Sequence, residues 1–552
     1  MQNRMGSVFF GLVVAVIGSS AANTYYVDAT GGNDGNNGTA ITSAWQSLSK
    51  VNGTTFGPGD EILLKAGEQW VGQLSPKGSG SSGNPIIIDK YGTGNKPFID
   101  GNGMTGGVVY LSDQQYWEIN NLRVKNYGAT QADRKGIYVT AQNPGTINHI
   151  YIRNNYVDSI EGQYSFGTVG NKANGGIYVA SGSAHFNDVV IDSNYVGYSG
   201  REGIYVKSSN NNYQNQSTHV IVKNNYLTYI KGDGIVLSAC DSALMENNIL
   251  DHGLYLNEDY YAGIWTWANR WTVVQYNEVR YSFPNSDGES FDLDGYNQEC
   301  IYQYNYSHNN PKGLILLCWG SHLNNIVRYN ISENDSCLPT VSGDINGCDI
   351  YNNTFYISGN NSNSGFQGGA GGGSKNLLFR NNIVYANGTN NLKMDGLFSL
   401  GHNVLYGKCS SWNDPHKITA DPQFTNGGNA HDGWANAASC YALHAGSPAI
   451  NAGIFITSNG GKDFAGNILP LSGPPDIGAL EYSAAGIRMT LMPAANTTMR
   501  STLYSPYHSN MVLSLNGRKV GGDRTHTGIY ILESPQKNPI LVRAGVLNNT
   551  AR

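Results

Sequence analysis

Charged residues are scarce in this chain. Asp, Glu, Lys and Arg make up 13% of its 552 residues, and the formal net charge is −6. No block of Lys and Arg is present, so we expect no nucleic-acid partner. After residue 17 no apolar run is long enough to cross a bilayer, so no membrane span is expected. The middle of the chain also lacks the 3.6-residue periodicity of helical repeats.

Glycine, tyrosine and asparagine are abundant instead. The chain has 70 glycines and 36 tyrosines, and asparagine is dense from Tyr25 to about residue 430. Gly and Asn favour turns, whereas Tyr favours strands. A disordered chain would lack this aromatic content. The composition therefore predicts a folded protein built from strands and frequent turns.

The first 22 residues have the features of an export signal. Arg4 supplies positive charge, an apolar run extends from Val8 to Ile17, and small residues follow up to Ala22. This run is too short to span a bilayer, so cleavage near Ala22 is predicted, with a buried N-terminal strand as the alternative. We therefore expect residues 1–22 to be a signal peptide and the mature protein to be secreted or held at the cell surface.

Cysteine is present at only seven positions. An exported protein permits disulfides, and Cys337–Cys348 and Cys409–Cys440 are candidate pairs, but the odd count leaves at least one thiol unpaired within the chain. No CxxC motif or Cys/His cluster has the spacing of zinc ligands, so no zinc site is predicted.

One short pattern recurs through the middle of the chain. Apolar residues alternate with other residues and are followed by Asn and another apolar residue, as in HIYIRNNYV and HVIVKNNYL. Alternation predicts a strand, and recurrence every 21 to 39 residues predicts a solenoid of stacked coils. We expect the asparagines to form an internal ladder at one turn. They are Asn155, Asn194, Asn225, Asn248, Asn277, Asn305, Asn330, Asn353 and Asn382, with looser copies at Asn121 and Asn403.

A second strand precedes several of these repeats. It begins with glycine in GIYVK from Gly203, GIVLS from Gly234 and GIWTW from Gly263, and SFDLD and GLILL continue the column. Two or three strands per coil predict an all-β fold, a right-handed parallel β-helix of about ten coils. In GIYVK, Ile204 and Val206 point inward, which leaves Tyr205 and Lys207 outside. The same register predicts the outward pairs Trp265/Trp267, Asp292/Asp294 and Ile315/Leu317.

Both ends of this region resemble secreted right-handed parallel β-helix proteins of bacterial polysaccharide degradation. YYVDATGGNDGNNGT and FGPGDEILLKAGEQW are similar to their N-terminal cap and first coils, and HAGSPAINAG and PPDIGALEY are similar to their closing segment. The resemblance implies one catalytic β-helix domain over residues 23–482. Because this group includes both hydrolases and lyases, the function has to be argued from the site.

The last part of the chain resembles a different kind of domain. LSLNGRKVGG and TGIYIL are similar to C-terminal sorting domains, which are small β-sandwiches used for secretion by some gliding or fibre-degrading bacteria. The resemblance implies that residues 483–552 form a linker and a sorting domain that engages the secretion machinery.

The motif DGESFDLDG is the best candidate for the chemical centre. Asp292 and Asp294 are predicted to project outward with backbones about 6.6 Å apart, and inverting glycosidases hold their two carboxyl groups roughly 6.5–9.5 Å apart. Glu289, at the start of the strand, is a further catalytic candidate as the proton donor. Like charges crowded together raise one pKa, which keeps an acid protonated. Calcium binding or simple surface solvation are the alternatives for these carboxylates.

Substrate-binding candidates surround this motif. Outward indoles are uncommon without a partner, so we expect Trp265 and Trp267 to stack on sugar, with coverage by a long loop as the alternative. Tyr205 extends this aromatic track. Lys207 and His308 are candidate groups for an acidic sugar, although His308 also suits a structural role. Glu202 and Asp233 precede the strand-opening glycines, where carboxylates also satisfy turn amides.

Three classes of function fit these features. A glycoside hydrolase needs a carboxylate pair, a polysaccharide lyase needs a base and calcium, and a non-catalytic glycan-binding surface protein needs only the aromatics. DGESFDLDG resembles the calcium strand of one β-helix pectate lyase family, but Ile315 stands where that family has its outward Lys. We therefore expect a monomeric hydrolase of xylan- or pectin-type polysaccharide that requires no cofactor, with a calcium-dependent lyase as the alternative.

Overall fold

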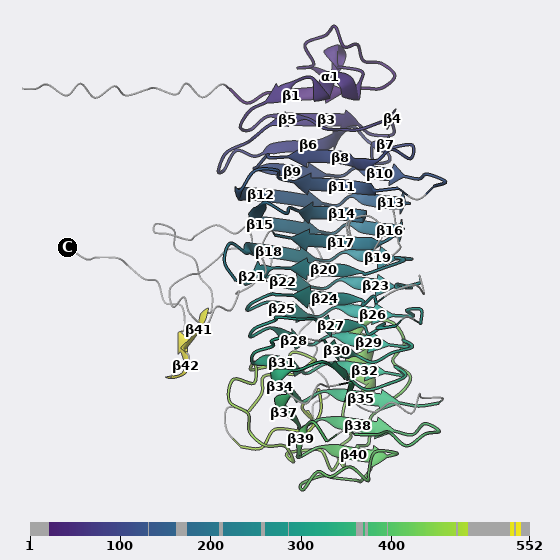
Figure 1. The fold of residues 1–552 in the computed structure, drawn as a ribbon, viewed down its shortest axis with the longest axis vertical. Coiled ribbons are helices and arrows are strands. Elements are labelled where there is room, and N and C mark those ends of the chain that lie inside the picture. The colour runs from purple at the N-terminus through teal and green to yellow at the C-terminus, as the bar shows by residue number, and fades with distance from the viewer. Residues whose placement is uncertain are drawn as a thin grey trace, which may run out of the picture.

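The computed structural model describes residues 21–483, apart from 131, 162–173, 209–212, 256–259, 285, 319, 360–367, 370–373, 395 and 471–472, together with two short strands at 530–534 and 537–542. Three long parallel sheets run along the molecule and enclose one core (Figure 1). The chain visits the three sheets in turn, so each full coil adds one strand to each sheet. The predicted right-handed parallel β-helix is confirmed.

The three sheets are named by their strand counts. The fifteen-stranded sheet contains β1 (Thr24–Val27), β3 (Glu61–Lys65), β6 (Ile86–Tyr91), β9 (Trp117–Asn120), β12 (Gly145–Arg153), β15 (Ala184–Asp192), β18 (Ser217–Lys223), β21 (Cys240–Asp241), β22 (Leu244–Glu246), β25 (Val273–Gln275), β28 (Ile301–Gln303), β31 (Asn325–Arg328), β34 (Asn346–Tyr351), β37 (Lys375–Arg380) and β39 (Ser399–Gly401). The thirteen-stranded sheet contains β4 (Gln69–Val71), β7 (Phe98–Asp100), β10 (Arg123–Asn126), β13 (Tyr156–Ile160), β16 (Tyr195–Ser199), β19 (Tyr226–Thr228), β23 (Ile249–Asp251), β26 (Glu278–Arg280), β29 (Tyr306–His308), β32 (Ile331–Glu333), β35 (Thr354–Ile357), β38 (Ile383–Ala386) and β40 (Val404–Gly407). The ten-stranded sheet contains β8 (Gly106–Ser112), β11 (Arg134–Thr140), β14 (Gly175–Ala180), β17 (Glu202–Lys207), β20 (Ile235–Ser238), β24 (Ile264–Trp267), β27 (Phe291–Leu293), β30 (Ile315–Leu317), β33 (Thr340–Ser342) and β36 (Gly368–Gly369).

The repeats underestimated the number of coils. The thirteen-stranded sheet shows more coils than the roughly ten expected, because the first coils, before residue 121, lack the asparagine pattern. At this end the short helix α1 (Leu48–Asn52), the 3-10 turn η1 (Ile41–Ser43) and the strand pair β2 (Thr55–Phe56) and β5 (Lys77–Gly78) cap the core. The remaining elements are α2 (Trp434–Cys440) and the antiparallel pair β41 (Tyr530–Ser534) and β42 (Lys537–Val542).

The predicted asparagine ladder runs through the core. Asn277 Nδ2 donates to Asn305 Oδ1 at 3.0 Å, and the same bond links each repeat asparagine to the next from Asn155 to Asn403. Asn121 is not part of it: Leu122 occupies the ladder position, and Asn121 instead donates to Asp89 at 2.7 Å. The ladder satisfies backbone groups at a buried turn in each coil from Asn155 to Asn403.

Glycine opens the strands of the ten-stranded sheet because the coils stack closely there. A Cβ on Gly234 would lie 2.5 Å from the Gly263 carbonyl oxygen and 2.7 Å from Leu250 Cδ2, and Gly203 is equally crowded. At Gly203 and Gly234, no larger residue fits without displacing the next coil. The residue before each glycine, such as Asp233, therefore reaches the outer side of the sheet, where its side chain meets Trp265.

The closing segment folds back along the helix after β40. Its side chains, among them Ala437, Tyr441 and Phe464, pack on tyrosines such as Tyr304 and Tyr329 in a second apolar core. No helix in the described part of the chain is long and apolar enough to cross a membrane. All seven thiols are free, so the candidate disulfides Cys337–Cys348 and Cys409–Cys440 are not formed. The expected signal peptide lies outside the described residues except for its last two, as does the sorting domain apart from β41 and β42.

Candidate functional site

The candidate acids lie on β27 and at its two ends. Asp292 pairs in register with Trp265 on β24 and with Leu316 on β30. Its side chain points outward as predicted, yet only 4% of it is exposed. Asp294 is half-buried just beyond the strand, where its Oδ1 accepts the Gly295 amide at 2.7 Å. The outer side of this strand is therefore enclosed rather than an open surface.

The register after β27 differs from the prediction by one residue. Phe291 pairs with Ile315, so Ile315 and Leu317 point inward and Leu316 points outward. The predicted register placed Gly313 at the first position of the strand, level with Ser290. In the structure Leu314 occupies that position. Neither Leu316 nor Ile315 is a base, so no Lys stands on the rung next to Asp292.

Glu289 is a buried carboxyl group at the entrance to β27. Burial raises its pKa to about 7, and the charge of Asp287 adds to that effect, while a hydrogen bond from Thr340 and the charge of Lys312 oppose it. Its Oε2 has no hydrogen-bond partner among the described residues. The predicted raised pKa is thus present, but burial is its main cause.

The start of β27 rests on a polar cluster inside the core. Ser290 Oγ lies 2.6 Å from Ser307 Oγ and accepts from Asn310 Nδ2 at 3.0 Å. Asp335 lies fully buried in the same cluster and accepts the Ser332 hydroxyl at 2.7 Å. This network fixes the backbone next to Glu289 and replaces the glycine of the preceding coils.

Trp265 lies beside the acids but is held by the protein. Its indole Nε1 donates to Asp233 Oδ1 at 2.8 Å, and the Ala262 amide donates to the same oxygen at 3.0 Å. Trp265 is only 5% exposed and Asp233 is fully buried, so the expectation of an exposed indole is wrong for Trp265. Trp267 is half-buried against Tyr296, with ring centroids 5.9 Å apart. Of the two tryptophans, Trp267 is the one that keeps exposed surface for a ligand.

Glu202 and Arg201 form a buried ion pair next to Asp233. Arg201 Nε lies 3.3 Å from Glu202 Oε1, and Arg201 Nη1 donates to the Tyr261 hydroxyl at 2.8 Å. Both charged side chains are almost completely buried. Negative charge from Glu202 and Asp233 outweighs burial and raises the pKa of Arg201. Tyr261 had no sequence signal, because its loop lies outside the repeat.

Tyr205 and Lys207 point outward from β17 as predicted. Tyr205 is buried in a small outer cluster with Tyr178, Val236 and Trp265. Burial, followed by the nearby charges of Glu202 and Asp233, raises the pKa of Tyr205. Lys207, two residues further along the same strand, is exposed. Tyr205 therefore supports the indole, whereas Lys207 is free to meet solvent or substrate.

His308 lies apart from this face, in the thirteen-stranded sheet. Its fully buried ring contacts Glu278 Oε1 at 3.0 Å and stacks on Tyr306. Glu278, His308 and Asp432 place possible metal ligand atoms within 4.8 Å of one another. Arg280 Nη1, however, lies 2.8 Å from Glu278 and 3.2 Å from Asp432, so a guanidinium already supplies the positive charge. The geometry is that of a structural ion-pair network, which favours the structural role of His308 over contact with an acidic sugar.

Comparison with known proteins found related glycoside hydrolases. A lacto-N-biosidase from Bifidobacterium longum is 28% identical over 85% of this chain and 37% of its own length. The crystal structure of a GH136 lacto-N-biosidase from Eubacterium ramulus superposes with a TM-score of 0.54 and 25% identity, covering 61% of this chain and 64% of that one. An α-1,3-galactosidase A from Akkermansia muciniphila is 35% identical over 16% of this chain and 14% of its own length. No protein-family model matches. The chain thus spans little more than a third of the length of the first curated relative.

Proposed function

We propose that this chain is an extracellular glycoside hydrolase that acts on oligosaccharides ending in lacto-N-biose. The observation that carries the proposal is its similarity to a lacto-N-biosidase over 85% of its length. This substrate class differs from the xylan- or pectin-type polymer expected from the sequence. A β-helix face that carries three acids and the partly exposed indole of Trp267 is suited to bind and cut such a chain.

The acids divide into two roles in this proposal. Glu289, with a pKa of about 7, holds its proton near neutral pH and suits the proton donor. It passes the proton to the glycosidic oxygen as the bond between that oxygen and the anomeric carbon breaks. Asp292 lies three residues after Glu289, roughly 10 Å along an extended backbone. Asp294 lies five residues after Glu289. One of these two carboxylates takes a proton from the attacking water or attacks the anomeric carbon itself.

Asp287 acts on Glu289 through its charge. Its carboxylate contributes to the raised pKa of Glu289, and the residue is partly exposed. Trp267 suits a stacking surface for a sugar ring, and Lys207 suits a hydrogen-bond donor to hydroxyl groups. Asp233 and Tyr205 hold the buried Trp265 in place, and Glu202 forms the ion pair with Arg201 beside Asp233. No metal ion is needed for this chemistry.

The proposal is tested by incubating the purified protein with lacto-N-tetraose, xylan and pectate, with and without a calcium chelator. Release of lacto-N-biose with a new reducing end, unaffected by the chelator, is the expected result. Products with the ultraviolet absorbance of an unsaturated uronate, lost on chelation, would instead identify the lyase alternative. Binding without any cleavage product would identify a glycan-binding protein.

A further inference from the structure

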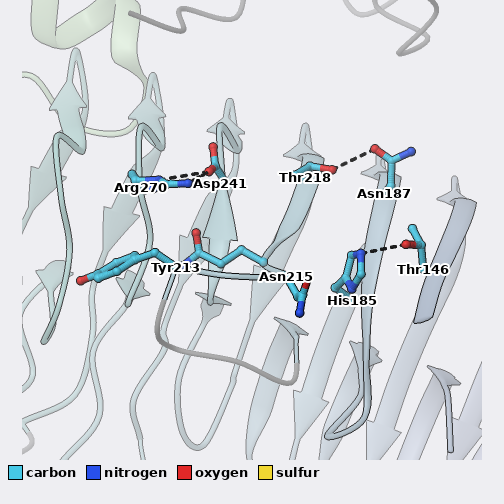
Figure 2. Close-up of a pocket in the computed structure, with 9 residues that line it drawn as sticks. Thr146, His185, Asn187, Tyr213, Asn215, Thr218, Asp241 and Arg270 are labelled. Atoms are coloured by element: carbon cyan, nitrogen blue, oxygen red, sulfur yellow. Dashed lines mark hydrogen bonds and ion pairs between the residues drawn. The ribbon is translucent and has the colours of Figure 1, made fainter. Parts of the chain in front are cut away.

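A depression lies on the fifteen-stranded sheet, apart from the acids of β27. Its volume is about 390 Å³, and it is bordered by β12, β15, β18, β21 and the chain segment that leads into β18. Figure 2 shows that its polar side chains come from successive coils and that Tyr213 and Asn215 form one wall. A concave space of this size suits a small organic ligand such as one or two sugar rings.

The polar groups of this depression are held in place by one another. Thr218 Oγ1 donates to Asn187 Oδ1 at 2.9 Å, and Asn187 Nδ2 donates to Asn148 Oδ1 at 3.0 Å. Thr146 Oγ1 and His185 Nε2 are 2.8 Å apart. The site is therefore ordered before a ligand arrives, which reduces the entropy cost of binding.

The charges in the depression cancel. Arg270 Nη2 lies 2.6 Å from Asp241 Oδ2, and both side chains belong to the lining. Burial lowers the pKa of His185, which is therefore neutral near pH 7. The remaining lining consists of amides, hydroxyls and the Tyr213 ring, which match the hydroxyl groups and the apolar face of a neutral sugar.

The wall of the depression is connected to the acid strand. The Tyr213 hydroxyl donates to the Tyr296 carbonyl oxygen, and Tyr296 follows Asp294 by two residues. The Tyr296 ring in turn packs against Trp267. Gln216 Nε2 fixes the same segment by donating to Ala268 O at 2.5 Å. Tyr213 is thus connected through the Tyr296 backbone, and Tyr296 through its ring, to Trp267 at the end of β24.

We propose that this depression is a distal binding subsite for a neutral sugar residue of a longer oligosaccharide whose cleaved end lies at β27. The inference rests on the proposed function for the position of the cleaved end. Binding itself does not require cleavage, so the two proposals fail separately. A sugar subsite accounts for the ordered, charge-balanced polar side chains that line this depression.

The subsite is tested by calorimetric titration of lacto-N-biose and lacto-N-tetraose into protein carrying Glu289→Gln, which prevents hydrolysis of the ligand. Adding Tyr213→Ala or Asn215→Ala is expected to weaken binding of the tetrasaccharide about tenfold and to leave the disaccharide unaffected. Tyr213→Phe keeps the ring and tests whether a loss reflects the ring or only the hydroxyl bond to Tyr296. Tyr127→Ala, at an exposed tyrosine elsewhere, is the matched control and should change neither affinity.

Equal affinities of the tetrasaccharide for Glu289→Gln protein with and without Tyr213→Ala and Asn215→Ala would overturn the subsite. Failure of the tetrasaccharide to bind at all would also overturn it. If Tyr213→Ala weakens binding but the wild-type protein cleaves no glycan, the subsite stands and the hydrolase proposal fails.

Discussion

At the scale of single residues, Glu289 combines burial with a carboxyl oxygen that has no hydrogen-bond partner among the described residues. Its ordinary pKa of 4.5 rises to about 7 in the folded protein. The folded state therefore binds a proton that the unfolded chain releases between these two values. Stability from this group is present below pH 4.5 and is lost as the pH rises to about 7.

Two pH effects follow for Glu289. If Glu289 is the proton donor, kcat/KM falls as the pH rises through about 7, and Asp287→Asn moves this fall to lower pH because a nearby negative charge is removed. Glu289→Gln should also abolish the loss of thermal stability between pH 4.5 and 7. A pH–rate profile and melting curves measure the two effects. An unchanged profile in Asp287→Asn would contradict the assigned donor.

The buried bond between Trp265 and Asp233 makes a separate prediction. Asp233→Ala leaves the indole N–H and the Ala262 amide without their acceptor, which should lower the free energy of unfolding by about 2 kcal/mol or more. Asp233→Asn retains an acceptor oxygen, so its free energy of unfolding should fall by less than that of Asp233→Ala. Lys207→Ala, two rungs away and exposed, is the control and should change stability by less than about 0.5 kcal/mol. Denaturant unfolding measures all three variants, and equal stabilities would refute the anchoring role.

At the scale of strands and turns, the repeat pattern was enough to predict the fold. Apolar alternation determines which residues face the core, and the asparagine at a fixed turn marks each coil. Register was predicted correctly through Asp292, then failed at Ile315 because Leu314 replaces the strand-opening glycine. The sequence did not decide the burial of Trp265, for which coverage was the stated alternative to exposure. In the structure Trp265 packs with Tyr205 and Val236 of the preceding coils, and Asp233 accepts its indole N–H.

The ladder provides a test at this scale. Asn277→Ala removes the acceptor used by Asn248 and the donor to Asn305 in a dry core, so the variant should lose about 3 kcal/mol or more of stability. Asn121→Ala is the matched control, because Asn121 carries the same sequence pattern but lies outside the ladder on the partly exposed surface. Denaturant unfolding of both variants distinguishes them. A loss of equal size in the two would contradict the ladder's role.

At the scale of the whole molecule, the closing segment is attached to the β-helix through charged groups. Glu278 Oε1 accepts from Arg280 Nη1 at 2.8 Å and from the Gly433 amide at 3.0 Å, just before α2. Burial alone would raise the pKa of Glu278, but hydrogen bonds from His308 and Gly433 and the charge of Arg280 lower it below 4.5. The attachment is therefore strongest when Glu278 is ionised.

Acid should release this segment before the β-helix unfolds. A lowered folded pKa contributes stability above pH 4.5, and that stability is lost as the pH falls through the folded pKa. The protection factors of the amide hydrogens of residues 430–441 should fall in this pH range in the wild-type protein. Glu278→Gln should have lower protection factors at neutral pH, and they should depend less on acid. Wild-type protection factors that do not depend on pH would show that apolar packing alone holds the segment.

The central claim is that the acids of β27 cut a glycan, and single-turnover cleavage of lacto-N-tetraose by four proteins tests it most directly. Wild-type protein should release the disaccharide, whereas Glu289→Gln and Asp292→Asn should each lose at least about 100-fold in rate while remaining folded. Trp267→Ala should mainly weaken binding. Near-normal rates in both acid variants, when the variants are folded and the wild-type protein is active, would contradict the account.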